Sequence, residues 1–89
     1  MDERRTYEVR LIPTAHRQLL RLPRRIRDRL ADAIRLLSGN PRPTGCKKLA
    51  GQADYYRIRV GDYRVLYEVR DHEILVIVIK IGHRREVYR

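Results

Sequence analysis

The chain has 89 residues, with 21 Lys and Arg against 11 Asp and Glu and a formal net charge of +10 at pH 7. This length predicts one domain over residues 1–89, and the excess of positive charge favours a polyanionic partner such as nucleic acid. A single cysteine, Cys46, excludes an intramolecular disulfide. The sequence has no apolar segment of roughly 20 residues and no signal-peptide pattern, which predicts a cytoplasmic protein with no membrane partner.

The first half of the chain predicts a strand followed by two helices. Residues 6–12 alternate between apolar and polar side chains, as expected of a half-buried strand. Pro13 ends this strand, and Thr14 is expected to cap a short helix. Residues 23–38 place apolar side chains on one helical face and Arg and Asp on the other, which predicts an amphipathic helix with Pro23 in its first turn.

The second half predicts three consecutive strands. Residues 54–60 and 63–70 alternate in polarity around a tight turn at 61–62. After a second turn at 71–73, residues 74–81 are apolar on both faces, which is typical of a central strand. The predicted class is therefore α+β, in the order β-α-α-β-β-β, with the helical hairpin packed on one face of a small, largely antiparallel sheet.

Strand alternation predicts a cluster of arginines on the other face of that sheet. Arg57 and Arg59 point away from the helices if Ile58 points toward them, and pairing around the tight turn brings Arg64 beside Arg59. Arg84, just beyond the last strand, is expected to reach the same hollow. Guanidiniums gathered in this way repel one another unless they bind an anion, and a phosphodiester fits the requirement.

These arginines and two C-terminal residues, His83 and Tyr88, also have structural interpretations. Charges at Arg57 and Arg59 discourage the aggregation of an edge strand, and Arg64 fits a structural ion pair. His83 fits a capping or surface histidine, and Tyr88 fits a packing residue that fixes the C-terminus. Frequent arginines also fit a GC-rich genome. The sequence has no metal-ligand spacing and no Gly-rich nucleotide loop, so neither a metal nor a cofactor is expected.

Three segments resemble the RelE/ParE superfamily of toxin–antitoxin toxins. They are LIPTAHRQLLRLP (11–23), KKLAGQADYYRIRVGDYRVLYEV (47–69) and IGHRREVY (81–88), and together they extend over nearly the whole chain. The resemblance implies a RelE-like fold. In the RelE branch it also implies a toxin that enters the ribosomal A site and cuts mRNA without a metal. There the 2′-hydroxyl attacks the neighbouring phosphorus, which leaves a 2′,3′-cyclic phosphate and a 5′-hydroxyl.

The resemblance also assigns roles to five residues. Arg57 and Arg59 occupy the positions of two lysines implicated in base catalysis, and Arg64 that of an arginine that stabilises charge on the phosphate. Arg84 matches an arginine that protonates or stabilises the leaving oxygen. Tyr88 matches a tyrosine that stacks on the nucleotide.

Arginine in place of lysine changes the expected chemistry, because a guanidinium stays protonated at neutral pH and is a poor general base. His83 is therefore the candidate general base, since imidazole changes charge near neutral pH. Gly82 is expected to let the chain turn off the last strand, so that His83 and Arg84 both face the scissile phosphate. Four more basic residues are expected to contact RNA or the ribosome through their charge: Lys47, Lys48, Arg85 and Arg89.

The implied partners are an acidic RelB-like antitoxin in a toxin–antitoxin hetero-oligomer, and the ribosome with its mRNA. The helix over 23–38 and the exposed sheet edge are the expected antitoxin docking surfaces. Two rival functions stay open: a ParE-like inhibitor of DNA gyrase, and a non-catalytic RNA-binding module of the same fold. Arg64, Arg84 and Tyr88 together favour the RelE branch.

Overall fold

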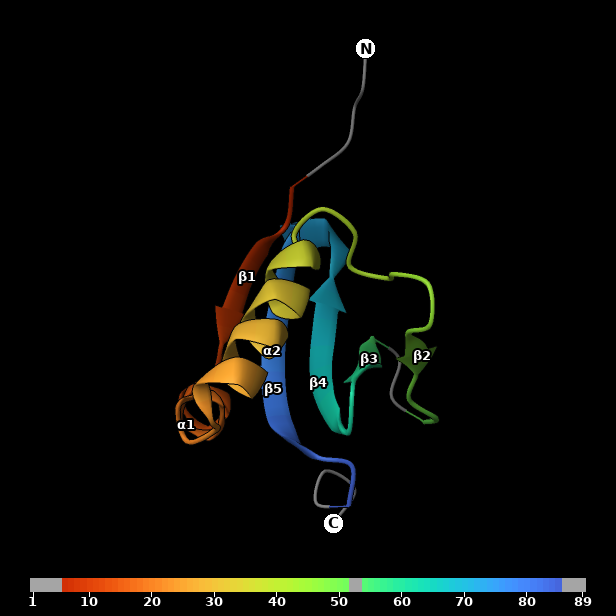
Figure 1. The fold of residues 1–89 in the computed structure, drawn as a ribbon. Coiled ribbons are helices and arrows are strands. Elements are labelled where there is room, and N and C mark those ends of the chain that lie inside the picture. Colours follow the sequence, from red (N-terminus) through yellow and green to blue (C-terminus); the bar gives the residue numbers. More distant parts are fainter. Residues whose placement is uncertain (1–5, 52–53, 86–89) are drawn as a thin grey trace.

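The computed structural model describes residues 6–51 and 54–85, and Figure 1 shows two helices against one twisted sheet. The elements in chain order are β1 (Glu8–Leu11), α1 (Pro13–Leu20), α2 (Arg24–Leu36), β2 (Lys47–Lys48), β3 (Tyr55–Val60), β4 (Tyr63–Arg70), the 3₁₀ turn η1 (Asp71–Glu73) and β5 (Leu75–His83). The predicted α+β class is confirmed. The sequence analysis missed only the two-residue strand β2, which it treated as a loop.

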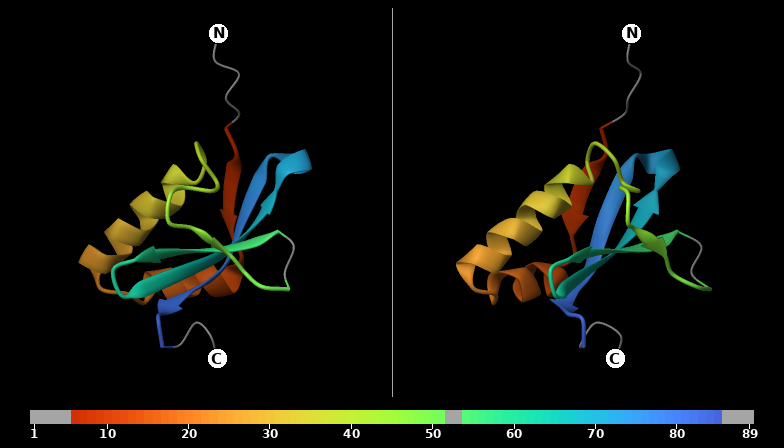
Figure 2. Two further views of the ribbon diagram at one scale, coloured as in Figure 1. Left: turned by 90° about the vertical axis from the view of Figure 1, so that its right-hand side faces the viewer. Right: turned by 45° about the vertical axis from the view of Figure 1, so that its right-hand side comes forward.

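The sheet has five strands in the order β1-β5-β4-β3-β2. β5 pairs in parallel with β1 and antiparallel with β4, so it is central, as its apolar composition predicted. The remaining pairs are antiparallel. Figure 2 shows both helices on the same side of this sheet. Within the described residues no helix is long and apolar enough to cross a membrane.

The helix starts differ slightly from those predicted. α1 begins at Pro13, and its N-cap is Ile12, which makes no side-chain capping bond, so Thr14 is already inside the helix. Proline fits the first helical position because its missing N–H has no intrahelical partner there and its φ is already helical. Pro23 is the N-cap of α2 and not a member of its first turn.

The core lies between the helical hairpin and the sheet. From α2, Leu30 and Leu37 are almost completely buried, and they belong to one cluster with Val65, Val76 and Val78 of the sheet. Burying an aliphatic side chain of this size contributes about 1.5–3 kcal/mol relative to leaving it exposed. The helices therefore hold one face of the sheet rigidly, and no described element covers the other face.

A β-bulge interrupts the pairing of β4 with β5. Leu66 is paired with Lys80, whereas the next residue, Tyr67, is paired with Val78, so Ile79 is an extra residue in β5. A bulge of this kind reverses the alternation of the strand beyond it. Val78 and Ile81 are three residues apart and yet both are buried in the core. The end of β5 therefore has its faces exchanged relative to simple alternation.

The loop between α2 and β2 is held on the sheet by two tyrosines. Tyr67 is fully buried, and its hydroxyl donates a hydrogen bond of 2.8 Å to the carbonyl of Pro41. The ring of Tyr56 stacks on Tyr67 with 6.0 Å between centroids. Because burial removes water from the phenol, the pKa of Tyr67 is raised.

Arg42 in the same loop joins three segments that are distant in sequence. It donates to Asp71 at 3.2 and 2.8 Å and to the hydroxyl of Tyr56 at 2.9 Å. The hydroxyl of Tyr7 donates to Asp71 as well, at 2.7 Å. These hydrogen bonds, first from Arg42 and then from Tyr7, hold the pKa of Asp71 at about 2.

This pKa predicts a pH-dependent contribution of Asp71 to stability. The folded value of about 2 lies below the ordinary 3.8, so the stabilisation is present above about pH 4 and is lost as the pH falls toward 2. We expect Asp71→Asn to lower the melting temperature by a few degrees at neutral pH and by nothing near pH 2, where the carboxyl is protonated in both states. Thermal unfolding followed by circular dichroism across this range measures the difference. Asp28→Asn, on the outer face of α2, is the control. An equal loss for Asp71→Asn at every pH would contradict the assignment.

Candidate nucleic-acid interface

The predicted arginines do lie on the face of the sheet opposite the helices, here called the helix-free face. In β3, Ile58 is in the core, so Arg57 and Arg59 on either side of it point the other way. In β4, Val65 is in the core, and the adjacent Arg64 is on the helix-free face. The facing predicted from alternation is confirmed for these three residues.

Strand register brings Arg59 and Arg64 directly opposite each other. They are Cα partners across the β3–β4 pair, and Arg64 is in turn the partner of Gly82 in β5. Side chains in directly opposed positions lie about 4.5–5.5 Å apart at Cβ, and like charges there are destabilising. Gly82 adds no side chain on the third strand. Two arginines therefore occupy facing positions on adjacent strands, an arrangement that a bound anion would stabilise.

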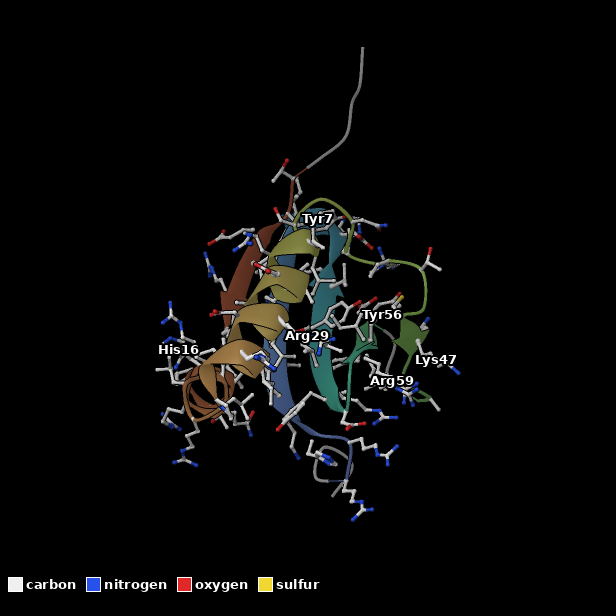
Figure 3. The ribbon with its side chains drawn as sticks, in the orientation of Figure 1. Tyr7, His16, Arg29, Lys47, Tyr56 and Arg59 are labelled. Atoms are coloured by element: carbon white, nitrogen blue, oxygen red, sulfur yellow. The ribbon has the colours of Figure 1, made fainter. Side chains whose placement is uncertain are left out.

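A second row of positive charge lies beside the first. This row crosses four strands. In β3, Arg57 is paired with Lys47 of β2 on one side and with Leu66 of β4 on the other, and Leu66 is in turn paired with Lys80 of β5. Lys47 was expected in a loop, but it is part of the sheet at the β2–β3 edge, and Figure 3 labels it there. Lys80 was not predicted, although a lysine within the apolar run of β5 was the available signal. We call Lys47, Arg57, Arg59, Arg64 and Lys80 the basic cluster.

Arg64 occupies a special position in this cluster because it is only 8% exposed, and no other charged side chain of the described residues is buried. Arg57 is half-buried and Arg59 is exposed. Charge interactions strengthen as water is excluded, so a phosphate that reached Arg64 would be held more strongly than at an exposed arginine.

The opposite end of the helix-free face neutralises its own charge. Arg10 of β1 pairs with Glu8 at 2.6 Å, and Arg70 of β4 pairs with Glu68 at 3.3 Å and with Glu73 at 3.6 Å. Acidic residues thus pair with the arginines at one end of the face, and the basic cluster lies toward the other end. The arrangement fits an anionic ligand that binds at one end of the face.

His83 is on the other side of the sheet from the arginines, contrary to expectation. It is the Cα partner of Tyr63, which packs against the core, and the two rings meet edge to face with 5.6 Å between centroids. The bulge at Ile79 is the physical reason. Without it, simple alternation from Val78 would place His83 on the helix-free face.

Arg84 lies in the turn directly after β5 and is exposed. Its backbone N–H donates a 2.8 Å hydrogen bond to the carbonyl of Asp62, which continues the β4–β5 ladder to the turn between Arg59 and Arg64. Gly82 does not release the chain from the sheet, because β5 continues through His83. The predicted approach of Arg84 to this end of the sheet therefore has a backbone basis.

The remaining predicted residues are dispersed. Lys48 is the partner of Tyr56 and so faces the helix side, away from Lys47. Arg85 is exposed in the turn after β5. Tyr88 and Arg89 lie outside the described residues. In the part of the chain that the structure describes, no three His, Cys, Asp or Glu side chains are grouped to hold a metal ion.

Comparisons with known proteins identify toxins of type II toxin–antitoxin systems, from both the ParE and the RelE branches. A family model described as the ParE toxin of the type II toxin–antitoxin system parDE matches residues 9–88. The toxin RelG of Mycobacterium tuberculosis is 34% identical over 84 residues, which is 93% of this chain and 97% of that protein.

Two solved structures are similar in both sequence and fold. A chain of the RelE–RelB complex from Pyrococcus horikoshii aligns with a TM-score of 0.81 and 30% identity, covering 92% of this chain and 99% of its own. A chain of the toxin–antitoxin complex RelBE2 from Mycobacterium tuberculosis aligns with a TM-score of 0.79 and 32% identity, covering 97% and 100%.

The basic cluster predicts salt-dependent binding of single-stranded RNA. Each phosphate contact that is lost reduces the slope of log affinity against log salt by about 0.7 for a single strand. The double variant Arg59→Gln, Arg64→Gln should therefore flatten the slope by about 1.4 and weaken binding about tenfold at moderate salt. Fluorescence anisotropy with a labelled oligoribonucleotide measures both quantities. The matched control is Arg10→Gln, Arg70→Gln at the self-neutralised end, and an equal effect there would refute a localised site.

Proposed function

Because this chain belongs to the RelE/ParE superfamily, whose members are toxins of type II toxin–antitoxin systems, we propose that it is a ribosome-dependent endoribonuclease that cuts mRNA in the ribosomal A site. The observation that carries the proposal is the position of Arg64, buried on the helix-free face between Arg59 and the side-chain-free Gly82. Such an activity requires the ribosome, so the proposal includes a cytoplasmic location.

In the proposed reaction the 2′-oxygen of one nucleotide forms a bond to the adjacent phosphorus, and its proton passes to water. The bond from phosphorus to the 5′-oxygen breaks, and that oxygen takes up a proton. A 2′,3′-cyclic phosphate and a 5′-hydroxyl result. No metal enters these steps.

Each arginine has a role that follows from its position. Arg64 donates to the non-bridging phosphate oxygens, whose negative charge increases in the transition state, and its burial makes this donation effective. Arg57 and Arg59 stabilise the charge that develops on the 2′-oxygen, since guanidiniums stay protonated at neutral pH. Arg84, held at the end of β5, stabilises the leaving 5′-oxygen.

One rival function has specific support, because the matching family model is that of the ParE toxins. A ParE-like protein would inhibit DNA gyrase and would not cut RNA. The arginines on three adjacent segments of the sheet favour the nuclease. A non-catalytic RNA-binding module would use the same cluster without producing new RNA ends.

A cleavage assay separates these functions. Purified protein and programmed ribosomes should yield cuts within the A-site codon that carry 2′,3′-cyclic phosphate ends. The Arg64→Ala, Arg84→Ala double variant should lose at least about 100-fold in rate, as is usual when preorganised donors to a developing charge are removed. Arg10→Ala is the control variant and should cut normally. Intact RNA together with inhibited supercoiling in a gyrase assay would replace the proposal with the ParE-like function.

The partner of such a toxin is an antitoxin, and the Pyrococcus and Mycobacterium relatives were solved as complexes with theirs. We propose that an acidic, amphipathic antitoxin segment occupies the groove between α2 and β3. This groove has a volume of about 390 Å³, and its lining includes Leu36, Pro43, Ile58 and Arg59. Leu36 is 73% exposed at its rim. Apolar side chains would cover Leu36, and a carboxylate would pair with Arg59, which belongs to the basic cluster.

This proposal predicts the effect of a charge in the groove. Leu36→Asp should weaken binding of the cognate antitoxin at least about tenfold, because an isolated carboxylate would be desolvated against apolar groups. Isothermal titration calorimetry measures the affinity. Leu20→Asp, at the other large exposed apolar residue, on α1, is the matched control. Equal weakening by both substitutions would exclude the groove as the specific docking surface.

A further inference from the structure

The chain immediately after β5 is fixed by hydrogen bonds from two backbone N–H groups, one to a carbonyl and one to a side chain. The N–H of Arg84 donates to the carbonyl of Asp62 at 2.8 Å, and the N–H of Arg85 donates to Nδ1 of His83 at 3.3 Å. The peptide groups on both sides of Arg84 are therefore fixed, one by the β3–β4 turn and the other by an imidazole.

The imidazole is itself fixed. It packs edge to face against Tyr63, and together they line a cavity of about 410 Å³ between α1 and the end of β5. Gln18 of α1 lines the same cavity, and its Oε1 accepts a 2.8 Å hydrogen bond from the N–H of Ile81. A ring anchored in this way holds its Nδ1 in a defined place for the turn that follows.

We propose that His83 is a positioning residue: its neutral imidazole locks the turn that carries Arg84, and its protonation releases that turn. The inference rests on the proposed function, because it describes how that function is regulated by pH. It also replaces the expectation that His83 is the general base.

The chemistry follows from the two nitrogens of imidazole. A neutral ring whose Nδ1 accepts a hydrogen bond carries its proton on Nε2. When the ring is protonated, both nitrogens are donors, so Nδ1–H meets the N–H of Arg85 and the bond is lost. The peptide after Arg84 then loses its anchor, and the guanidinium is no longer held at the end of the sheet.

Among the described residues that line its cavity, none would take over this role. Two of the residues that line its cavity, Arg21 of α1 and Lys80 of β5, are cations. The side-chain oxygen of Gln18 already accepts a hydrogen bond from Ile81, and Tyr63 contacts the imidazole through its aromatic ring. In the part of the chain that the structure describes, no carboxylate lines this cavity. Asp62 lines the neighbouring cavity with Arg29. Protonation of His83 would therefore gain no acidic partner for the ring among these groups.

Direct base catalysis by His83 does not fit the geometry. His83 lies on the helix side with Tyr63, whereas Arg59 and Arg64 are on the helix-free face. A ribose placed for cleavage among the arginines is separated from the imidazole by the sheet itself. A role through the backbone of the following turn needs no such contact.

The test compares cleavage rates under saturating toxin across a range of pH. Wild type should cut more slowly at the acidic end of the range, where the imidazole is protonated. His83→Asn offers an acceptor oxygen near the position of Nδ1 and does not titrate, so it should retain most of the rate and show a flat profile. His83→Ala should be slow at every pH, with a reduced kcat and an unchanged KM. His72→Ala, an exposed histidine at the other end of β5, should behave as wild type.

Two outcomes would overturn the proposal. If His83→Asn is as slow as His83→Ala, the imidazole acts chemically and not as an acceptor. If both variants match wild type, the turn does not need His83. A parallel NMR titration of the Arg85 amide tests the lock without RNA. The amide should shift with the His83 ring in wild type and stay constant in His83→Asn. Should wild type cut no RNA at any pH, the proposed function fails, and this titration still decides whether the lock exists.

Discussion

The one extra residue in β5 determines the functional geometry of this protein. Because Ile79 has no partner in β4, the last four residues of the strand are shifted by one position relative to simple alternation. Ile81 can then close the core against Val65, and Gly82 lies beside Arg64. A regular strand would instead place a side chain next to Arg64 and turn Ile81 outward. The bulge therefore both places Ile81 in the core and leaves the position beside Arg64 without a side chain.

The charge distribution shows a second constraint. Five basic residues on one end of a sheet oppose folding, since like charges at paired positions repel. The fold tolerates them because the helix side supplies a continuous apolar core and the far end of the same face pairs its arginines with glutamates. A phosphodiester bound at this site would reduce the repulsion between its guanidiniums. Stability and function are assigned to different parts of one small sheet.

The two faces of the sheet are not independent, because residues near the β3–β4 turn and the end of β5 take part in features of both faces. Arg59 belongs to the basic cluster and also lines the groove beside α2. The turn after β5, which carries Arg84, is held by His83 from the helix side and by the carbonyl of Asp62. An antitoxin segment in the groove or a proton on His83 would act on the arginine site from behind the sheet. In this domain of 89 residues, antitoxin binding and protonation of His83 would thus be two separate ways to change the activity of the arginine site.

The sequence by itself determined the fold class, the helical and strand segments and the side of the sheet on which Arg57, Arg59 and Arg64 lie. These depend on local periodicity and on a two-residue turn, both of which are readable from neighbouring residues. Its motifs also pointed to the toxin family that the comparisons established. Only the tertiary structure decided the place of Lys47 and Lys80 in the basic cluster, the burial of Arg64 and the facing of His83. Each of these depends on which strands pair and on where the register slips, and a bulge leaves no local signature in a run of apolar residues such as Ile77-Val78-Ile79.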